Sequence, residues 1–256
     1  MTKPQDAGLR LERNGPIVRI TLDRPAQHNA LGLAEVDAFH QSLDDLETHD
    51  EARVLVLTGA GDRTFCAGAS LAQMERGEMT GARFETITDR LAHLRMPTLC
   101  ALNGSAYGGG AELALCCDFR IGSPEMQVSV PAARLGLCYP VGGLGRYVRR
   151  LGLGAASRIL LANEALAGDE LYRIGYLTHL TDRERIAAEA DALAARLADL
   201  APLAVQGMKR IMLATAAGDV DVEEAERLIA RAATSEDVRE GLRAALERRE
   251  PRFLGR

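Results

Sequence analysis

The stretch PTLCALNGSAYGGGAELALCCD, residues 97–118, joins two apolar runs through a glycine turn and contains a glutamate just after that turn. Residues 98–102 follow a proline and predict a short buried strand, which an Asn-Gly pair ends. Residues 111–117 have helical composition, so the glycines at 108–110 are expected to open a helix. Backbone N–H groups at the start of a helix have no partner within it, and they suit an anion or a developing oxyanion.

Glu112 lies in the first turn of this expected helix, where a carboxylate is electrostatically tolerated. One interpretation is that the glycines only make a tight turn and that Glu112 is a solvated acid. A second stretch favours a site instead, because residues 54–58 predict another buried strand and residues 59–70 after it are rich in small side chains. Two such turns can bring two backbone N–H groups onto one carbonyl oxygen, which is the geometry of an oxyanion hole.

Taken in order, these motifs resemble those of the enoyl-CoA hydratase/isomerase (crotonase) superfamily. The matching residues extend over nearly the whole chain and comprise Arg24-Pro25, residues 28–31, 57–59 and 65–69, Pro97, residues 101–118, Pro131, Leu135-Gly136, Gly142-Gly143, and residues 167–177 and 241–253. The resemblance implies an α/β fold, in which a ClpP/crotonase-like spiral of ββα units precedes a C-terminal helical region that forms homotrimers or dimers of trimers. It also implies an acyl-CoA thioester substrate, with coenzyme A as part of the substrate and no separate cofactor or metal.

The resemblance also assigns roles to particular residues. The backbone amides of Ala69 and Gly109 are expected to hold the thioester oxygen, and Glu112 is expected to act as acid or base. Coenzyme A is expected along a set of residues drawn from three parts of the chain: Pro25, Gln27, His28, Ala30, Ala67, Ala69, Ser70, Leu71 and, from a neighbouring subunit, Phe253, with Arg248 and Arg249 as weaker candidates. From the residues alone, His28 is equally well explained as an ordinary loop side chain.

Hydratases of this family have a second glutamate twenty positions after the first, and that position is Ala132 here. Paired carboxylates share the activation of water and the handling of the α-proton, whereas the family's isomerases rely chiefly on the second position. We therefore predict an enoyl-CoA hydratase-like lyase of fatty-acid or related acyl-CoA metabolism that uses Glu112. Two alternatives stay open: a decarboxylase of a carboxylated acyl-CoA, and a non-catalytic acyl-CoA-binding protein.

Three polar side chains close to Ala132 in the sequence are further candidates. Tyr139 resembles a tyrosine that helps to place the substrate carboxylate in decarboxylases of the superfamily, and its alternative role is that of a packed aromatic. Cys138 is either a small buried residue or a nucleophile. Arg134 is either a ligand for an acyl carboxylate or a partner in a surface ion pair.

The composition excludes several other classes of function. The net charge of −5 argues against a nucleic-acid-binding surface, and 256 residues with 47% hydrophobic content allow one sizeable core with a small helical appendage. The five cysteines form no C-x-x-C pair, which predicts neither a disulfide framework nor a metal site. We expect a cytoplasmic protein, since neither a signal peptide nor an apolar run of about 18 residues occurs in the sequence.

Local patterns predict most of the elements between these motifs. Residues 9–12 and 17–22 alternate around an Asn-Gly pair and predict a hairpin, residues 33–48 predict a helix, and residues 73–82 predict a loop. The family resemblance implies that this loop borders the acyl pocket. From residue 182 onward the chain is predicted to be helical, in four segments at 182–199, 202–216, 222–233 and 236–249. We therefore divide the chain into a core with the acyl-CoA site, residues 1–181, and an oligomerisation region, residues 182–256.

Overall fold

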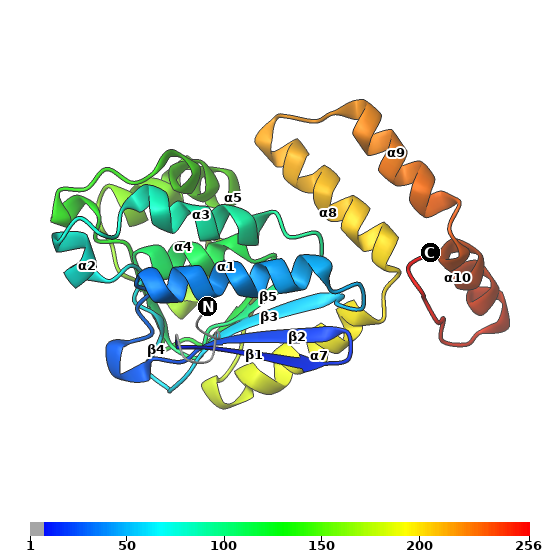
Figure 1. Ribbon diagram of the computed structural model, residues 1–256, viewed down its shortest axis with the longest axis horizontal. Coiled ribbons are helices and arrows are strands. Elements are labelled where there is room, and N and C mark those ends of the chain that lie inside the picture. The colour runs from blue at the N-terminus through cyan, green and yellow to red at the C-terminus, as the bar shows by residue number, and fades with distance from the viewer. Residues whose placement is uncertain (1–7) are drawn as a thin grey trace.

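The computed structural model describes residues 8–256, in which helices surround two β-sheets (Figure 1). The larger sheet has six strands, and five of them run parallel while the edge strand β1 is antiparallel to β2. In spatial order its strands are β1 (Leu9–Asn14), β2 (Ile17–Leu22), β3 (Val54–Gly59), β5 (Thr98–Ala101), β7 (Phe119–Gly122) and β10 (His179–Leu180). The predicted hairpin is confirmed as β1 and β2.

The smaller sheet has four strands, and their spatial order is the same as their order along the chain. They are β4 (Thr64–Cys66), β6 (Ser105–Tyr107), β8 (Gln127–Ser129) and β9 (Leu166–Ala167), and only β9 is antiparallel to its neighbour. The chain passes from the larger sheet to the smaller one three times, at β3–β4, β5–β6 and β7–β8. This repetition produces the spiral of ββα units that the sequence predicted.

Ten α-helices cover and connect these sheets within the described residues. They are α1 (Leu33–Thr48), α2 (Leu71–Glu75), α3 (Gly81–Ala92), α4 (Gly109–Cys116), α5 (Val141–Leu160), α6 (Gly168–Arg173), α7 (Ile186–Ala198), α8 (Pro202–Ala217), α9 (Val222–Ala233) and α10 (Glu236–Glu247). Side-chain caps fix several of the starts, because Thr80, Asp221 and Ser235 each accept a hydrogen bond from the backbone N–H three residues later.

The core forms on both faces of the larger sheet. Leu55 and Leu57 of β3 belong to one cluster, together with Phe39 of α1, whereas Val54 and Val56 belong to a second cluster on the opposite face. Both faces are therefore buried, as expected for a parallel sheet. Helix α4 is apolar apart from Glu112, and all of its residues from Gly110 to Cys116 are buried, so it lies inside the core.

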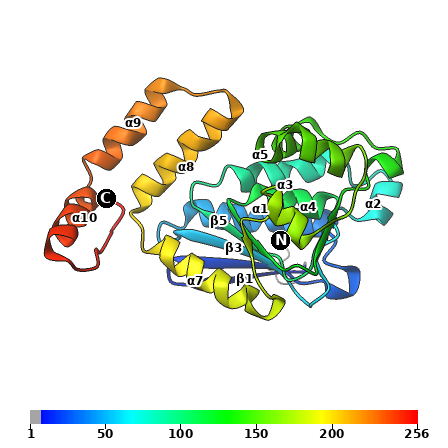
Figure 2. The ribbon, with the colours of Figure 1, turned by 180° about the vertical axis from the view of Figure 1, so that it is seen from behind.

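Helix α7 packs against the larger sheet, where its residues Ile186, Ala190 and Leu193 cover β3 and β5. The three helices that follow, α8–α10, extend away from both sheets (Figure 1), and the view from behind shows the same arrangement (Figure 2). Helix α7, the first α-helix of the predicted oligomerisation region at residues 182–256, thus lies against the core. Helix α8 begins at Pro202 and keeps a contact with the core through buried Lys209, whose Nζ donates to the carbonyl oxygen of Met96.

Two local features of the fold concern segments that contain glycine, and the first differs from the sequence prediction. The predicted loop at 73–82 begins within the short helix α2, which follows an extended Ser70. Helix α5 is interrupted at Gly152, where φ is 76°, and the helix continues on either side of this residue. Within residues 8–256, the helices lack the length and apolar character that a membrane crossing requires.

Candidate active site

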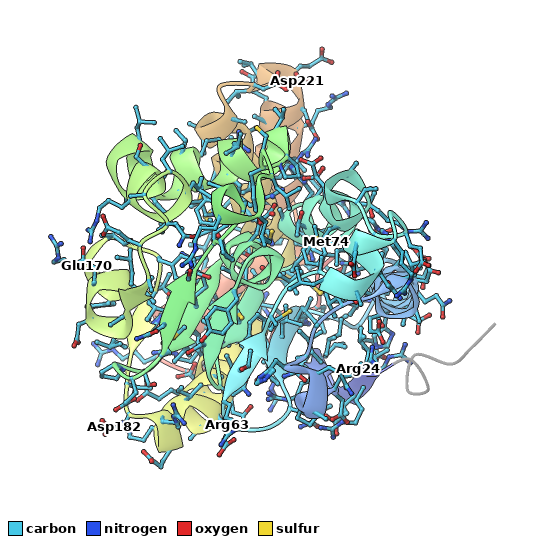
Figure 3. All side chains as sticks on the ribbon, turned by 90° about the vertical axis from the view of Figure 1, so that its left-hand side faces the viewer. Arg24, Arg63, Met74, Glu170, Asp182 and Asp221 are labelled. Atoms are coloured by element: carbon cyan, nitrogen blue, oxygen red, sulfur yellow. The ribbon has the colours of Figure 1, made fainter. Side chains whose placement is uncertain are left out.

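A cavity of about 540 Å³ opens where the ends of β4 and β6 meet the start of α4. The cavity lies near the end of the molecule that faces the viewer in Figure 3, beside Met74 of α2. Helices α8–α10 lie at the other end (Figures 1 and 3). Most lining residues are apolar or glycine: Ala67, Ala69, Leu71, Met74, Gly81, Phe84, Gly108, Gly109, Pro131, Ala132, Leu135, Leu137 and Pro140, with His28, Thr64, Tyr107, Glu112, Cys138 and Tyr139 as the polar or aromatic members.

The two small-residue turns that the sequence singled out are in contact at this cavity. Gly68 has φ of 87°, and a Cβ atom on it would lie 2.7 Å from the amide nitrogen of Gly109. A Cβ atom on Gly110 would lie 2.2 Å from the carbonyl oxygen of Cys66. Any larger residue would push the two turns apart, so the glycines are required for their close approach. The predicted convergence of the two turns is present in the structure.

The amide groups of Ala69 and Gly109 both belong to residues that line the cavity. Leu31 donates to the carbonyl oxygen of Gly68 and accepts from the amide of Ser70, forming a parallel bridge opposite Ala69. Because successive backbone groups of an extended chain point in opposite directions, the Ala69 N–H faces away from Leu31. Gly109 is the first residue of α4, where the N–H groups have no partner within the helix.

Glu112 is buried, with only 3% of its surface exposed, and it reaches the cavity from the first turn of α4. The interpretation of Glu112 as a solvated first-turn acid is therefore wrong. Its Oε1 accepts a hydrogen bond from Nη1 of Arg146 in α5. Burial raises the pKa of Glu112 above its ordinary value, while the charge of Arg146 and hydrogen bonds from Tyr139 and Thr88 oppose that rise.

Tyr139 combines the two roles that the sequence left open. Its ring packs edge-on against Tyr147, with ring centroids 6.2 Å apart, and it also lines the cavity. Its hydroxyl is hydrogen-bonded to Glu112, and burial together with the nearby carboxylate raises the pKa of Tyr139 well above its usual range. Tyr139 is therefore a packed aromatic whose polar end faces the candidate acid–base group.

The segment that carries the other candidates forms one wall of the cavity. Ala132 and Cys138 line it, and Cys138 is exposed rather than buried. Arg134 is exposed and lies outside the cavity lining. The interpretation of Cys138 as a small buried residue is thus wrong, and Ala132 presents only a methyl group where the resemblance predicted a second carboxylate.

The residues expected to contact coenzyme A fall into two groups. His28, Ala67, Ala69 and Leu71 line the cavity, while Pro25, Gln27, Ala30 and Ser70 flank them in the same two segments. Both His28 and Asn29 have positive φ, and the side chain of Asn29 holds this loop through contacts with the carbonyl oxygens of Ala60, Thr64 and Phe65.

Phe253 lies outside the cavity of its own chain. Its ring stands beside Gly241 of α10, and its carbonyl oxygen accepts a hydrogen bond of 2.6 Å from Arg53. Contact of Phe253 with a neighbouring subunit's coenzyme A stays a prediction. The larger hollow beside it, of about 1140 Å³, is lined chiefly by charged residues, among them Arg249 and Glu240, which pair at 2.6 Å.

Sequence reasoning missed Arg146 and Thr88, which both contact the carboxylate of Glu112. Arg146 is 34 positions from Glu112 along the chain, and nothing in the local pattern of α5 sets it apart from Arg149 and Arg150. Among residues 8–256, the side chains of His, Cys, Asp and Glu form no cluster of three or more that could hold a metal ion.

Comparison with known proteins gives a consistent result. The family model for enoyl-CoA hydratase/isomerase matches residues 12–256. A carnitinyl-CoA dehydratase from Salmonella enteritidis is 33% identical, with the alignment covering 97% of this chain and 98% of the relative. Two crystal structures also superpose closely. An enoyl-CoA hydratase from Bacillus anthracis has a TM-score of 0.88 at 28% identity, covering 97% of this chain and all of the other. A putative enoyl-CoA hydratase/isomerase family protein from Hyphomonas neptunium has a TM-score of 0.91 at 26% identity, covering 97% and 98%.

Proposed function

Because the chain belongs to the enoyl-CoA hydratase/isomerase (crotonase) family, whose members act on acyl-CoA thioesters, we propose that it is a lyase that adds or removes water, with Glu112 as its single acid–base group. The observation that carries this proposal is the position of Glu112, whose carboxylate lines the same cavity as Ala69 and Gly109. The likeness to a carnitinyl-CoA dehydratase supports a lyase that adds or removes water.

The chemistry requires one carboxylate that gives back the proton it takes. In the hydration direction, ionised Glu112 accepts a proton from water while the hydroxide oxygen bonds to the β carbon of the enoyl thioester. The electron pair of the double bond moves to the thioester oxygen, where the amides of Ala69 and Gly109 stabilise the enolate by about 3 kcal/mol each. Protonated Glu112 then delivers its proton to the α carbon, so that one water is added in all.

The lining of the cavity supports an apolar acyl group. Phe84, Met74 and Pro140 lie on the walls, and the exposed side chains of Leu71 and Leu135 extend the apolar surface outward. An acyl chain buried against such a surface gains about 0.8 kcal/mol for each CH₂ group. We place the coenzyme A portion along His28 and residues 67–71, where the exposed loop at 25–28 leaves backbone groups accessible.

Decarboxylation of a carboxylated acyl-CoA is less well supported by the geometry. A decarboxylase of this kind would use Tyr139 to place a substrate carboxylate, but the hydroxyl of Tyr139 is engaged by Glu112. An ionised Glu112 would also repel a second carboxylate in the same cavity. Non-catalytic binding is disfavoured too, because burying a carboxylate costs free energy that a simple acyl-CoA binder has no reason to spend.

We also propose that α8–α10 assemble the chain into a homotrimer or a dimer of trimers. Large apolar side chains are exposed along these helices, including Met208, Met212, Ile229, Leu242 and Leu246. Packing against further copies of the chain would remove these side chains from water and place Phe253 at a neighbour's site. Light scattering on the purified protein tests this assembly, and a monomer at micromolar concentration would contradict it.

The reaction is tested by mass spectrometry of the products formed from a panel of thioesters. The panel contains crotonyl-CoA, longer 2-enoyl-CoAs, the matching 3-hydroxyacyl-CoAs and methylmalonyl-CoA. We expect the enoyl thioesters to gain one water or the hydroxyacyl thioesters to lose one. Loss of carbon dioxide from methylmalonyl-CoA alone would establish the decarboxylase instead, and tight binding of every thioester without any product would contradict both enzymatic assignments.

A further inference from the structure

The guanidinium group of Arg146 lies between two carboxylates from two other helices. Its Nη1 donates to Oε1 of Glu112 in α4, and its Nη2 donates to Oδ1 of Asp89 in α3 at 2.6 Å. The exposed fractions of the side chains are 3% for Glu112, 6% for Arg146 and 50% for Asp89. A chain of charges thus runs from the buried acid at the cavity to the surface of the protein.

Stability alone does not account for this arrangement. Replacing a buried ion pair by well-packed apolar residues is often neutral or stabilising, so such a pair is weak evidence for a structural role. Burial of this pair removes both charges from water, since only 3% of the Glu112 side chain and 6% of the Arg146 side chain are exposed. What distinguishes Arg146 is the atom that it contacts, since Oε1 belongs to the only carboxylate among the residues lining the cavity.

We propose that Arg146 is a positioning residue for the reaction, held by Asp89, which keeps Glu112 ionised in the resting enzyme and leaves Oε2 as the oxygen that exchanges protons with the substrate. This inference rests on the acid–base role proposed for Glu112. With Ala132 in place of a second carboxylate, Glu112 is the only carboxylate among the residues lining the cavity, and the proposed reaction uses it as the base. The single carboxylate must therefore be ionised before each turnover, and a fixed positive charge beside it meets that need.

The other groups around Glu112 act on its charge more weakly or in the opposite direction. Helix α3 contributes Thr88, whose nearby hydroxyl lowers the pKa of Glu112, and Glu85, whose negative charge raises it. The segment before α5 contributes the hydroxyl of Tyr139. The remaining neighbours with titratable groups are Asp89 of α3, Tyr147 of α5, Cys116 of α4 itself and Tyr176. Arg146 is the strongest influence that lowers the pKa of Glu112.

The experiment compares Arg146→Met, Arg146→Lys and Asp89→Asn with a matched control on the same helix. Arg150→Met serves as that control, because Arg150 is partly buried in α5 and faces Asp118 at 3.9 Å instead of Glu112. The protonation of Glu112 is followed by infrared spectroscopy over a pH series, through the carboxyl band that is absent in Glu112→Gln. This readout requires no turnover, so it tests Arg146 even if the proposed reaction is wrong.

We expect the midpoint of Glu112 protonation to move to higher pH by about one unit or more in Arg146→Met, since a neighbouring positive charge has been removed. Turnover near neutral pH should fall about tenfold or more, while KM changes by less than about threefold. Arg146→Lys should restore most of the midpoint but only part of the turnover, because an ammonium group cannot pair with Glu112 and Asp89 in the same fork geometry.

Asp89→Asn provides a second measurement should Arg146→Met fail to fold. This variant keeps the guanidinium of Arg146 but removes the charged partner of Nη2. We therefore expect a smaller loss of turnover than in Arg146→Lys and little change in the midpoint of Glu112 protonation. Arg150→Met should match the wild type in both readouts. The proposal is overturned if folded Arg146→Met titrates at the wild-type midpoint, if Arg146→Lys and Asp89→Asn both keep the wild-type turnover, or if Arg150→Met moves the midpoint as far as Arg146→Met.

Discussion

A Cβ atom placed on Gly143 would lie 3.1 Å from Oε1 of Glu112, so helix α5 passes the buried carboxylate at a distance that leaves no space for a side chain. The same Cβ atom would lie 2.6 Å from Cε1 of Tyr139, whose ring is fixed against Tyr147. The glycine therefore sets how closely the helix that carries Arg146 can approach the helix that carries Glu112.

Gly143→Ala should accordingly damage both stability and activity. Overpacking at this point should cost about 1–3 kcal/mol of unfolding free energy and displace Tyr139 or Glu112, lowering turnover about tenfold or more. Gly154→Ala is the matched control, because it lies on the same helix with nothing within 4 Å of its added Cβ. That variant should instead gain about 0.5–1 kcal/mol. Equal stability and activity in the two variants, measured by denaturant unfolding and steady-state kinetics, would contradict this account of Gly143.

The pH dependence of turnover should follow the raised pKa of Glu112. A base must be ionised, so activity is lost as the pH falls through the pKa of the folded protein, and this loss should occur at a higher pH than for an ordinary glutamate. The same shift acts on stability. The favourable contribution of protonated Glu112 is complete below the pKa of the unfolded chain and is lost as the pH rises through the folded value. The melting temperature of Glu112→Gln relative to the wild type should thus increase from acidic to neutral pH, and a constant difference would refute the assigned shift.

Ala132→Glu should increase the rate of hydration. It places a second carboxylate among the residues lining the cavity, where it can take over part of the proton transfer that Glu112 performs alone. Its negative charge should also raise the pKa of Glu112 further, so the acidic limb of the pH profile should move upward. Rates of water addition to crotonyl-CoA measure the effect, with Ala133→Glu as the control in the neighbouring position. Equal rates in the two variants would indicate that the native reaction has no use for a second acid.

Asn29 should prove important for the coenzyme A loop. Its amide group contacts three carbonyl oxygens, its Oδ1 accepts from the amide of Arg24, and its φ is 54°. Asn29→Ala removes these bonds and leaves the strained backbone, for a cost of about 3 kcal/mol and a higher KM for the thioester. Asn163→Ala is the control, since that residue shares the left-handed backbone, at φ of 52°, but its Oδ1 has no hydrogen-bond partner within residues 8–256. Similar losses in both variants would show that the hydrogen bonds of Asn29 matter little.

Local sequence signals predicted the fold well wherever an element carries its own pattern. The helices at Leu33–Thr48 and Val222–Ala233 begin and end as expected, because each has an apolar stripe and recognisable ends. Helix α2 was taken for part of a loop, since five residues are too few to show a helical period. The sequence also could not predict that α7 packs against the larger sheet. Its apolar stripe of Ile186, Ala190 and Leu193 would fit another helix equally well.

One part of the candidate site could be predicted from local sequence patterns, and another part could not. The close approach of Gly68 to Gly109 followed from two strand–turn motifs that each carry a local signature. The pairing of Glu112 with Arg146 could not be predicted, because it depends on how α5 packs over α4, 34 residues further along the chain. No spacing rule connects residues so far apart, and only the folded chain brings them together.

The central claim is that Glu112 is the single acid–base group, and the most direct test measures turnover and thioester binding together in Glu112→Gln. Glutamine keeps the size of the side chain and can still accept a hydrogen bond from Arg146, so the fold and the cavity should survive. We predict that the variant binds the substrate thioester within about threefold of the wild type by calorimetry, while turnover falls by about 10²–10⁴-fold. Turnover that stays close to the wild-type rate would contradict the account.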